Sequence, residues 1–289
     1  MKVAIVGNCQ ARPLARYLSL LKPEIEIVAT PIVHLLKEHE RDDCLRSLEQ
    51  ADFIISQNIA DSYPCSFIRT SLLKQQFGAK VNTILNLYFS GYTPDLLYIR
   101  HPTVGTLRGP LGEYHSKTIL DGWLLGIDPK QVVNWLSDPF YNQQEYAEQQ
   151  SISLAELKDR ELSVDIKITD FIQHNLLKQR LFFTFNHPCA LVLTEYAQRI
   201  LEYKIGDRGD PTKCLKLPEQ LDQIIPKLAM PVAELNGNSD KHKGQAVTNV
   251  VGPDVSISEA KYYTDIELVE CFYHIYAKND QFIREKYDT

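Results

Sequence analysis

Cys9 stands where a thiol could act as a nucleophile. Residues 3–6 are β-formers that lead into Gly7. Asn8, Cys9 and Gln10 follow, at the place where a strand would end and a helix would begin. Such a turn lifts one side chain clear of the carboxyl edge of a sheet and points backbone N–H groups at the same spot. A helix N-terminus also lowers the pKa of a thiol. The same position equally suits a small buried residue that lets strand and helix approach closely.

Three neighbours of Cys9 are further candidates. The side chain of Gln10 and the N–H groups of Cys9 and Gln10 could form an oxyanion pocket for a tetrahedral intermediate, or they could only cap a helix. Arg12, one turn along, is a candidate for binding phosphate, although an exposed helix arginine is the commoner case. Gly7 is a further candidate for binding a cofactor, although Gly7 alone is not a dinucleotide fingerprint.

Two of the eight histidines lie in unusual settings. His115 ends a Gly/Pro-rich loop and begins a predicted helix, so its ring could reach a cleft or simply cap that helix. His187, in Asn186-His187-Pro188, ends an apolar run and is either a base or a hydrogen-bonded core residue. A histidine near Cys9 could accept the thiol proton.

Several other kinds of site are missing from the sequence. The histidines and carboxylates show no metal-ligand spacing, so we expect no metal. No G-x-G-x-x-G follows the first strand and no G-x-x-x-x-G-K-[ST] occurs, which argues against a Rossmann cofactor site or a P-loop. The six cysteines are widely separated, and we expect most of them to be buried, inert thiols.

The elements that would position these residues alternate between strand and helix. Apolar patterns predict a parallel sheet with helices on both faces over residues 1–95, that is, a three-layer α/β subdomain. Its predicted strands cover residues 3–6, 24–30, 51–57 and 80–89, and its predicted helices cover 11–21, 42–49 and 66–77.

Ligands of open α/β sheets bind beyond the carboxyl ends of the strands. In this chain those ends carry polar side chains, among them Asn8, Gln57 and Ser90. We therefore expect the segments 8–10, 56–58 and 88–91 to converge on one site.

The remainder, residues 96–289, is predicted to be mainly helical and to complete the cleft. A Gly/Pro-rich stretch over 91–115 predicts a long loop, and residues 236–244 predict a second, polar one. Helices are predicted over 117–125, 129–137, 141–149, 154–180 with a break near 163, 190–203, 218–228 and 258–287.

Length, composition and charge indicate which broad classes of protein this chain can belong to. With 289 residues, of which 44% are hydrophobic, the chain can bury a substantial core. The formal net charge of -6 is spread without long runs, so nucleic acid is not an expected partner. No apolar stretch approaches the roughly 18 residues of a membrane span, and no secretory leader is recognisable. We expect a cytoplasmic protein.

Five motifs together resemble the WcbI-type polysaccharide biosynthesis family. They are Val6-Gly-Asn-Cys-Gln-Ala11, Ser56-Gln57, Phe89-Ser-Gly-Tyr-Thr-Pro-Asp95, Gly109-Pro-Leu-Gly-Glu-Tyr-His-Ser116 and Asn186-His187-Pro188. The Gly109–Ser116 loop makes the match fairly specific, and the last third of the chain carries no matching motif. The strand-then-cysteine opening also looks like the nucleophile turn of SGNH-type esterases with cysteine in place of serine.

The resemblance implies an acetyltransferase of capsule or surface-glycan assembly that binds coenzyme A, with an α/β subdomain set into a mostly helical protein. Acetyl-CoA would be the donor and a sugar or glycan the acceptor, with the CoA phosphates met by Arg12, Arg108 and Lys117. Cys9, His115 and His187 would be catalytic, and Asn8, Gln10, Gln57, Ser90 and Asn186 would line the site. A cysteine-dependent esterase and a non-catalytic CoA-binding scaffold are the alternatives.

Overall fold

The computed structural model describes residues 1–228 and 239–287. Its contacts divide the chain into two units, and the chain passes between them several times. Unit 1 comprises Met1–Tyr88, Leu154–Leu176 and Asn186–Leu221, and unit 2 comprises Phe89–Ser153, Leu177–Phe185 and Asp222–Thr289. Unit 1 thus contains most of the predicted α/β subdomain together with two later segments.

Unit 1 is built on a four-stranded sheet whose strands are all parallel. The strands are β1 (Lys2–Val6), β2 (Glu26–Ala29), β3 (Phe53–Gln57) and β4 (Val81–Ile84), in the order β2-β1-β3-β4. Strands β1 and β3 lie in the middle and are almost entirely buried. Continuous apolar runs are typical of such central parallel strands, because both faces are covered.

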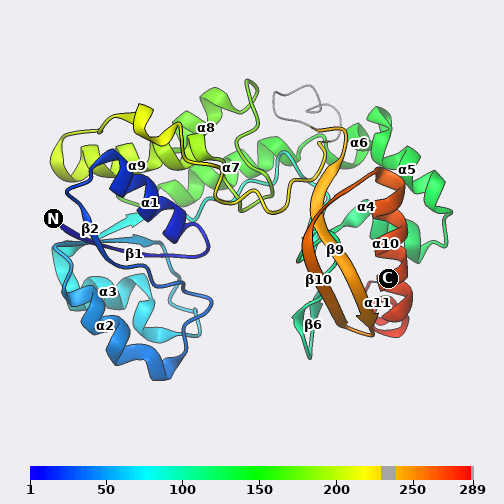
Figure 1. The fold of residues 1–289 in the computed structure, drawn as a ribbon, viewed down its shortest axis with the longest axis horizontal. Helices are drawn as coiled ribbons and strands as arrows, with labels where there is room; N and C mark the ends of the chain where they lie inside the picture. The colour runs from blue at the N-terminus through cyan, green and yellow to red at the C-terminus, as the bar shows by residue number, and fades with distance from the viewer. Residues whose placement is uncertain (229–238, 288–289) are drawn as a thin grey trace. The chain divides into compact units, whose positions relative to one another are not determined.

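Helices cover both faces of this sheet. Figure 1 shows α1 (Ala11–Leu21) and α9 (Ala190–Ile205) on one side and α2 (Arg41–Glu49) and α3 (Thr70–Phe77) on the other. The buried positions of α1 recur at helical spacing, which gives it one apolar face. Residues on α2 and α3, including Leu48 and Leu73, form one core cluster with Ala4, Val6 and Ile54 of the sheet. The three-layer α/β subdomain predicted from the sequence is confirmed.

Unit 2 combines short antiparallel strands with helices. The strand β5 (Leu96–Tyr98) pairs with β8 (Tyr114–Ser116), and β6 (Arg100–His101) pairs with β7 (Gly105–Thr106). A longer hairpin joins β9 (His242–Val251) to β10 (Asp254–Tyr263) through a turn where Gly252 has φ +55°. Its helices are α4 (Lys117–Leu124), α5 (Pro129–Ser137), α6 (Pro139–Tyr146), α10 (Asp265–Lys278) and α11 (Asp280–Tyr287).

The remaining helices are α7 (Gln149–Glu161) and α8 (Thr169–Asn175), with short 3-10 turns at Glu38–Glu40, Ser66–Ile68, Gly78–Lys80 and Pro211–Cys214. The break between α7 and α8 agrees with the one predicted near residue 163. The whole chain is predominantly helical outside the sheet, as predicted. None of the helices within 1–228 and 239–287 is long and apolar enough to cross a bilayer.

Three predicted elements are wrong. The helix predicted over 258–287 begins only at Asp265, because residues 254–263 form β10, and it is divided into α10 and α11. Thr264 starts α10 through a capping box with Glu267, so the helix has a defined beginning after the hairpin. The helix predicted over 218–228 is irregular chain in which Ile225 bridges to Lys243. The loop predicted over 91–115 contains β5, β6 and β7 and runs into β8.

Two other predictions differ in their bounds. Strand β4 ends at Ile84 and not at residue 89, because the backbone N–H groups of Leu85 and Leu87 donate to side chains, those of Tyr196 and Gln10, instead of to a neighbouring strand. The polar loop predicted over 236–244 lies partly outside the described residues, and β9 begins at His242 within it.

Candidate functional site

The turn after β1 lies at the carboxyl edge of the unit 1 sheet. Gly7 still belongs to that sheet, because its N–H donates to Pro31 O (3.2 Å) and its carbonyl accepts from Val33 N–H (2.9 Å). A Cβ added at Gly7 would lie 2.9 Å from both Cδ and Oε1 of Gln57. Only glycine therefore lets the Gln57 side chain lie across the turn.

Gln57, at the end of β3, binds the turn through its amide. Its Oε1 accepts from the backbone N–H of Asn8 (2.8 Å), and its Nε2 donates to Asn8 Oδ1 (3.2 Å) and to Gln10 Oε1 (2.9 Å). Asn8 Oδ1 also accepts from Gln10 N–H at 3.0 Å. These bonds fix the residues on either side of Cys9.

Gln10 extends the network to two further segments. It is 2% exposed, and its Nε2 donates to Leu87 O (2.7 Å) and Asn186 O (2.8 Å), while its Oε1 accepts from Leu87 N–H (3.1 Å). Asn8 Nδ2 donates to Asn86 Oδ1 at 2.9 Å. We call Asn8, Gln10, Gln57 and Asn86 the amide network. It joins the ends of β1, β3 and β4 to the segment that carries His187, and its side chains are all uncharged.

Cys9 lies between two fixed residues at the beginning of α1, and its side chain is neither fully buried nor exposed. Burial raises the pKa of the Cys9 thiol to about 11, and the hydrogen bond with the Cys9 backbone lowers it by less. The expected thiolate is therefore not the resting form at neutral pH.

His187 belongs to unit 1, and the residue before it accepts a hydrogen bond from Gln10. Burial lowers the pKa of His187 to about 4, and a hydrogen bond with the Leu221 backbone opposes that change. Its imidazole is consequently neutral at pH 7 and able to accept a proton.

His115 is a core residue of unit 2. It is fully buried, and its two ring nitrogens lie 3.1 Å from Tyr276 Oη and 3.0 Å from Leu107 O. Its ring packs on Phe272 and Tyr276, and burial lowers its pKa to about 4. This environment supports a structural role, and a catalytic role for His115 stays a prediction.

The other predicted site residues are divided between the units. Arg12 is exposed on α1 in unit 1. In unit 2, Ser90 is buried, its Oγ accepting from Gln149 and its N–H donating to Ser153 Oγ (2.9 Å), whereas Arg108 and Lys117 are exposed. Lys117 forms an ion pair with Asp121. The residues that the structure brings together are Gly7, Asn8, Cys9, Gln10, Gln57 and Asn186.

Sequence reasoning missed two residues of this site. Asn86 was overlooked because β4 was predicted to run on to residue 89, so that the polar residue just after the strand looked like part of it. Arg160 donates to the carbonyls of Asn86 and Tyr88, both at 3.0 Å, and so holds the segment that follows β4. Arg160 comes from α7 and nothing in the sequence near it indicated this contact. The described residues contain no cluster of His, Cys, Asp or Glu side chains placed to hold a metal ion.

Fold and site together define an α/β protein with a partly exposed cysteine at its first strand-to-helix turn. The chain belongs to the family described as polysaccharide biosynthesis enzyme WcbI, whose model matches residues 2–206. That region includes every member of the amide network. The family is one of polysaccharide biosynthesis enzymes.

A solved structure has a similar fold, with a TM-score of 0.71 and 20% sequence identity over 98% of this chain and 97% of that chain. It is described as WcbI, a novel polysaccharide biosynthesis enzyme, in its native form without a disulfide bond between coenzyme A and a cysteine. A search among curated proteins gave no match.

Proposed function

We propose that this protein transfers an acetyl group from acetyl-CoA to a hydroxyl group of a sugar during polysaccharide biosynthesis, at the turn formed by residues 7–10. The observation that carries the proposal is a partly exposed cysteine held on a rigid, uncharged turn in a member of the WcbI family. The description of the similar solved structure, which mentions coenzyme A and a cysteine, supports coenzyme A as a ligand at this turn.

The exposed guanidinium of Arg12 lies one helical turn beyond Cys9 and is suited to a phosphate of CoA. Arg108 and Lys117 are also exposed, and their role as phosphate ligands stays a prediction. The pairing of Lys117 with Asp121 would have to be shared with or exchanged for such a phosphate.

Two routes of transfer are compatible with these residues. In the covalent route, Cys9 attacks the acetyl carbon, the C–S bond of acetyl-CoA breaks and the Cys9 proton passes to the CoA thiolate; a sugar hydroxyl then attacks the enzyme thioester, its C–S bond breaks and the hydroxyl proton passes to the Cys9 thiolate. In the direct route, the hydroxyl attacks acetyl-CoA, a histidine accepts its proton, the C–S bond breaks and the proton passes to the CoA thiolate.

The resting protonation states favour the direct route. Burial raises the pKa of Cys9 to about 11 and lowers that of His187 to about 4, so both groups are neutral at pH 7 and Cys9 offers no preformed thiolate. A resting thiolate–imidazolium pair is therefore not expected. Neutral His187 can accept the hydroxyl proton in the same step as the attack on the acetyl carbon, so that no free alkoxide forms.

The amide network determines which groups can stabilise the oxyanion. Both hydrogens of Gln10 Nε2 are engaged, with Leu87 O and Asn186 O, which makes Gln10 a positioning residue. Asn8 Nδ2 uses one hydrogen for Asn86, and its second hydrogen has no acceptor among the described residues. We infer that Asn8 Nδ2 and the Cys9 N–H are the donors to the oxyanion.

A specific observation also favours a second candidate, a non-catalytic CoA-binding protein of glycan assembly. The same high pKa of Cys9 and the low pKa of His187 that disfavour a thiolate would leave a site able to hold CoA without chemistry. The two candidates differ in whether acetyl groups leave CoA.

The test is mass spectrometry of products and protein after incubation with acetyl-CoA, with and without a panel of free sugars and sugar nucleotides. The proposal expects an acetylated sugar and no acetyl adduct on Cys9 in the absence of acceptor. His187→Gln should lower the rate by about a hundredfold or more, the usual size of a lost general base. Cys9→Ser should keep much of the activity.

Cys271→Ser is the matched control, because Cys271 is also partly buried with a thiol pKa of about 11 but lies in unit 2 on α10. It should leave the rate unchanged. An acetyl adduct on Cys9 that disappears when a sugar is added would establish the covalent route in place of the direct one. CoA binding without acetyl transfer to any sugar of the panel would favour the non-catalytic candidate.

A further inference from the structure

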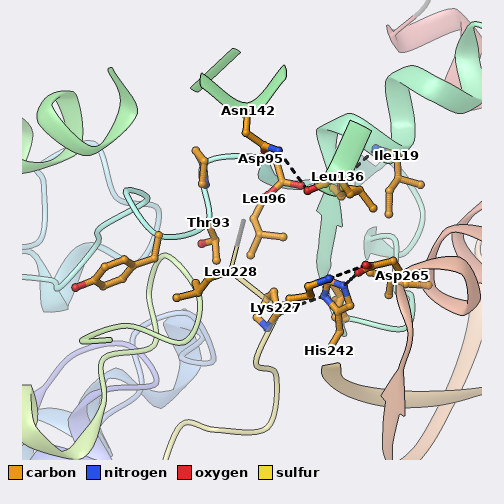
Figure 2. Close-up of a pocket in the computed structure, with 16 residues that line it drawn as sticks. Thr93, Asp95, Leu96, Ile119, Leu136, Asn142, Lys227, Leu228, His242 and Asp265 are labelled. Carbon is orange, nitrogen blue, oxygen red and sulfur yellow. Dashed lines mark hydrogen bonds and ion pairs between the residues drawn. The ribbon is translucent and has the colours of Figure 1, made fainter. Parts of the chain in front are cut away.

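Unit 2 contains a cavity of about 50 Å³ that the proposed acetyl transfer does not use. Figure 2 shows its wall, which comes from the chain around Thr93 to Leu96, the α5–α6 corner, and the beginnings of β9 and α10. At one water per 10 to 15 Å³ of such space, it has room for roughly four water molecules. That is enough for two or three hydroxyl groups of a ligand.

One wall of the cavity is a closed ionic cluster. His242 Nε2 lies 2.8 Å from Asp265 Oδ1, Lys227 Nζ donates to Asp265 Oδ2 (2.7 Å), and the Lys227 backbone N–H donates to His242 Nδ1 (3.1 Å). Because Nδ1 accepts a hydrogen bond, the network assigns the His242 proton to Nε2 and makes the ring neutral. The charge of Lys227 is thus offset by that of Asp265.

A second carboxyl, that of Asp95, lies on the same cavity. Burial raises its pKa, while a hydrogen bond with Ser116 opposes that change. The polar groups therefore carry a net charge between zero and minus one. An anion such as a CoA phosphate would meet two carboxyl groups, and a cationic amine would meet the ammonium group of Lys227.

Two polar side chains of the wall can form further hydrogen bonds. Thr93 is 3% exposed, and its Oγ1 has no hydrogen-bond partner among the described residues. Asn142 is held by its Nδ2, which donates to the carbonyls of Trp135, Leu136 and Asp138, so that its Oδ1 remains as an acceptor. Buried polar atoms are rarely left without a partner, so an orphaned hydroxyl on a cavity wall points to a ligand or a water.

The rest of the lining is largely apolar and includes Leu96, Leu111, Ile119 and Leu268. Such a mixture suits a molecule that has C–H surfaces as well as hydroxyl groups. We propose that this cavity binds the hydroxyl-bearing edge of an uncharged carbohydrate ring, with Thr93 and Asn142 as hydrogen-bond partners and Asp95 as acceptor. This inference does not rest on acetyl transfer, because all of the site's residues belong to unit 2 and none belongs to the turn around Cys9.

The experiment is saturation-transfer NMR on the full chain in the absence of CoA. The probes are the methyl glycosides of glucose, galactose, mannose and N-acetylglucosamine, with inorganic phosphate and ethanolamine as charged competitors. We expect at least one glycoside to bind with millimolar affinity and neither charged probe to displace it.

Thr93→Val removes the orphaned hydroxyl with little change of shape, and it should weaken binding roughly three- to tenfold, the value of one hydrogen bond. Thr93→Ser should restore binding. Thr169→Val is the matched control, since Thr169 Oγ1 is likewise buried without a partner among the described residues but belongs to unit 1. It should not change the affinity.

Folding of the variants is checked by thermal unfolding. Neither valine variant should unfold at a lower temperature, because neither lost hydroxyl has a partner in the protein. Failure of every glycoside to bind would overturn the proposal. So would equal binding by wild type and Thr93→Val, or displacement of a glycoside by phosphate or ethanolamine.

Discussion

The side chains that fix the turn on either side of Cys9 are uncharged amides, and this limits what the thiol can do. Asn8, Gln10 and Gln57 offer amide hydrogen bonds to one another, and burial raises the pKa of Cys9 to about 11. A thiolate would need a positive neighbour or a strong base to form at neutral pH. The turn therefore does not favour formation of a thioester by its own cysteine.

The pH dependence of alkylation tests this point. Thiolate is the reactive form, so the rate at which iodoacetamide labels Cys9 should rise about tenfold per pH unit from pH 7 to pH 9, without a plateau. The measurement is peptide mass spectrometry after short labelling times. Labelling that is already at its plateau near pH 7 would show that Cys9 has an activated thiol, contrary to this account.

Much of this residue-level picture was predictable, because Asn8, Gln10 and Gln57 stand directly after strands that the apolar runs define. The partners Asn86 and Arg160 were not. Asn86 depends on where β4 ends, and Arg160 reaches the site from more than seventy residues away in sequence. Contacts of that kind are set by the tertiary fold and leave no local pattern.

At the scale of elements, Gln57 is the residue that ties β3 to the turn after β1. Gln57→Leu should lower the free energy of unfolding by about 2 kcal/mol, since the partly buried Asn8 N–H would lose its acceptor and Gln10 Oε1 would lose one of its two donors. Urea unfolding followed by circular dichroism measures the change.

The control for this prediction is Gln75→Leu, the same substitution at an exposed position of α3 in the same unit. It should change the free energy of unfolding by less than about 0.5 kcal/mol. If the two variants are equally stable, the amide network does not hold the strand ends together.

The periodicity of the sequence located the elements of unit 1 well and failed at the C-terminal end. Helical spacing of apolar residues gave α1 its bounds, because one face of that helix is buried and the other is not. Residues 258–263 have helix-compatible composition, yet they form β10 because they pair with β9 across the turn at Gly252. Pairing between strands is a non-local contact, and the Gly252-Pro253 turn was the only local signal for it.

On the scale of the whole molecule, each of the two units contains a histidine of low pKa. The pKa of His115 in unit 2 and of His187 in unit 1 is lowered to about 4 by burial, against an ordinary value of 6.5. Between pH 4 and pH 6.5 these histidines bind protons in the unfolded chain but not in the folded chain. Their contribution to the free energy of unfolding is therefore fully present above pH 6.5 and is lost as the pH falls toward 4.

We therefore expect the free energy of unfolding to fall by as much as about 1.4 kcal/mol per pH unit for each histidine between pH 6.5 and pH 4. Urea unfolding at a series of pH values measures this slope. In the His115→Gln variant the new side chain does not titrate, so the slope should decrease by up to about 1.4 kcal/mol per pH unit. A slope that is flat over this range would mean that the buried histidines remain free to take up protons.

The family model covers residues 2–206, whereas the solved structure of similar fold covers 98% of the chain. The β9–β10 hairpin and α10 therefore lie outside the region that the family model matches but within the region of similar fold. Lys227, His242 and Asp265 of the unit 2 cavity come from this later part, whereas the amide network lies within the matched region. The proposed acetyl-transfer site and the proposed carbohydrate-binding cavity therefore draw on different parts of the chain.

The most direct test of the central claim is hydrogen–deuterium exchange with and without acetyl-CoA. If acetyl-CoA binds at the turn after β1, peptides that contain residues 7–12 should exchange more slowly in its presence. Slower exchange elsewhere with no change in residues 7–12, or no change anywhere at saturating acetyl-CoA, would contradict the account.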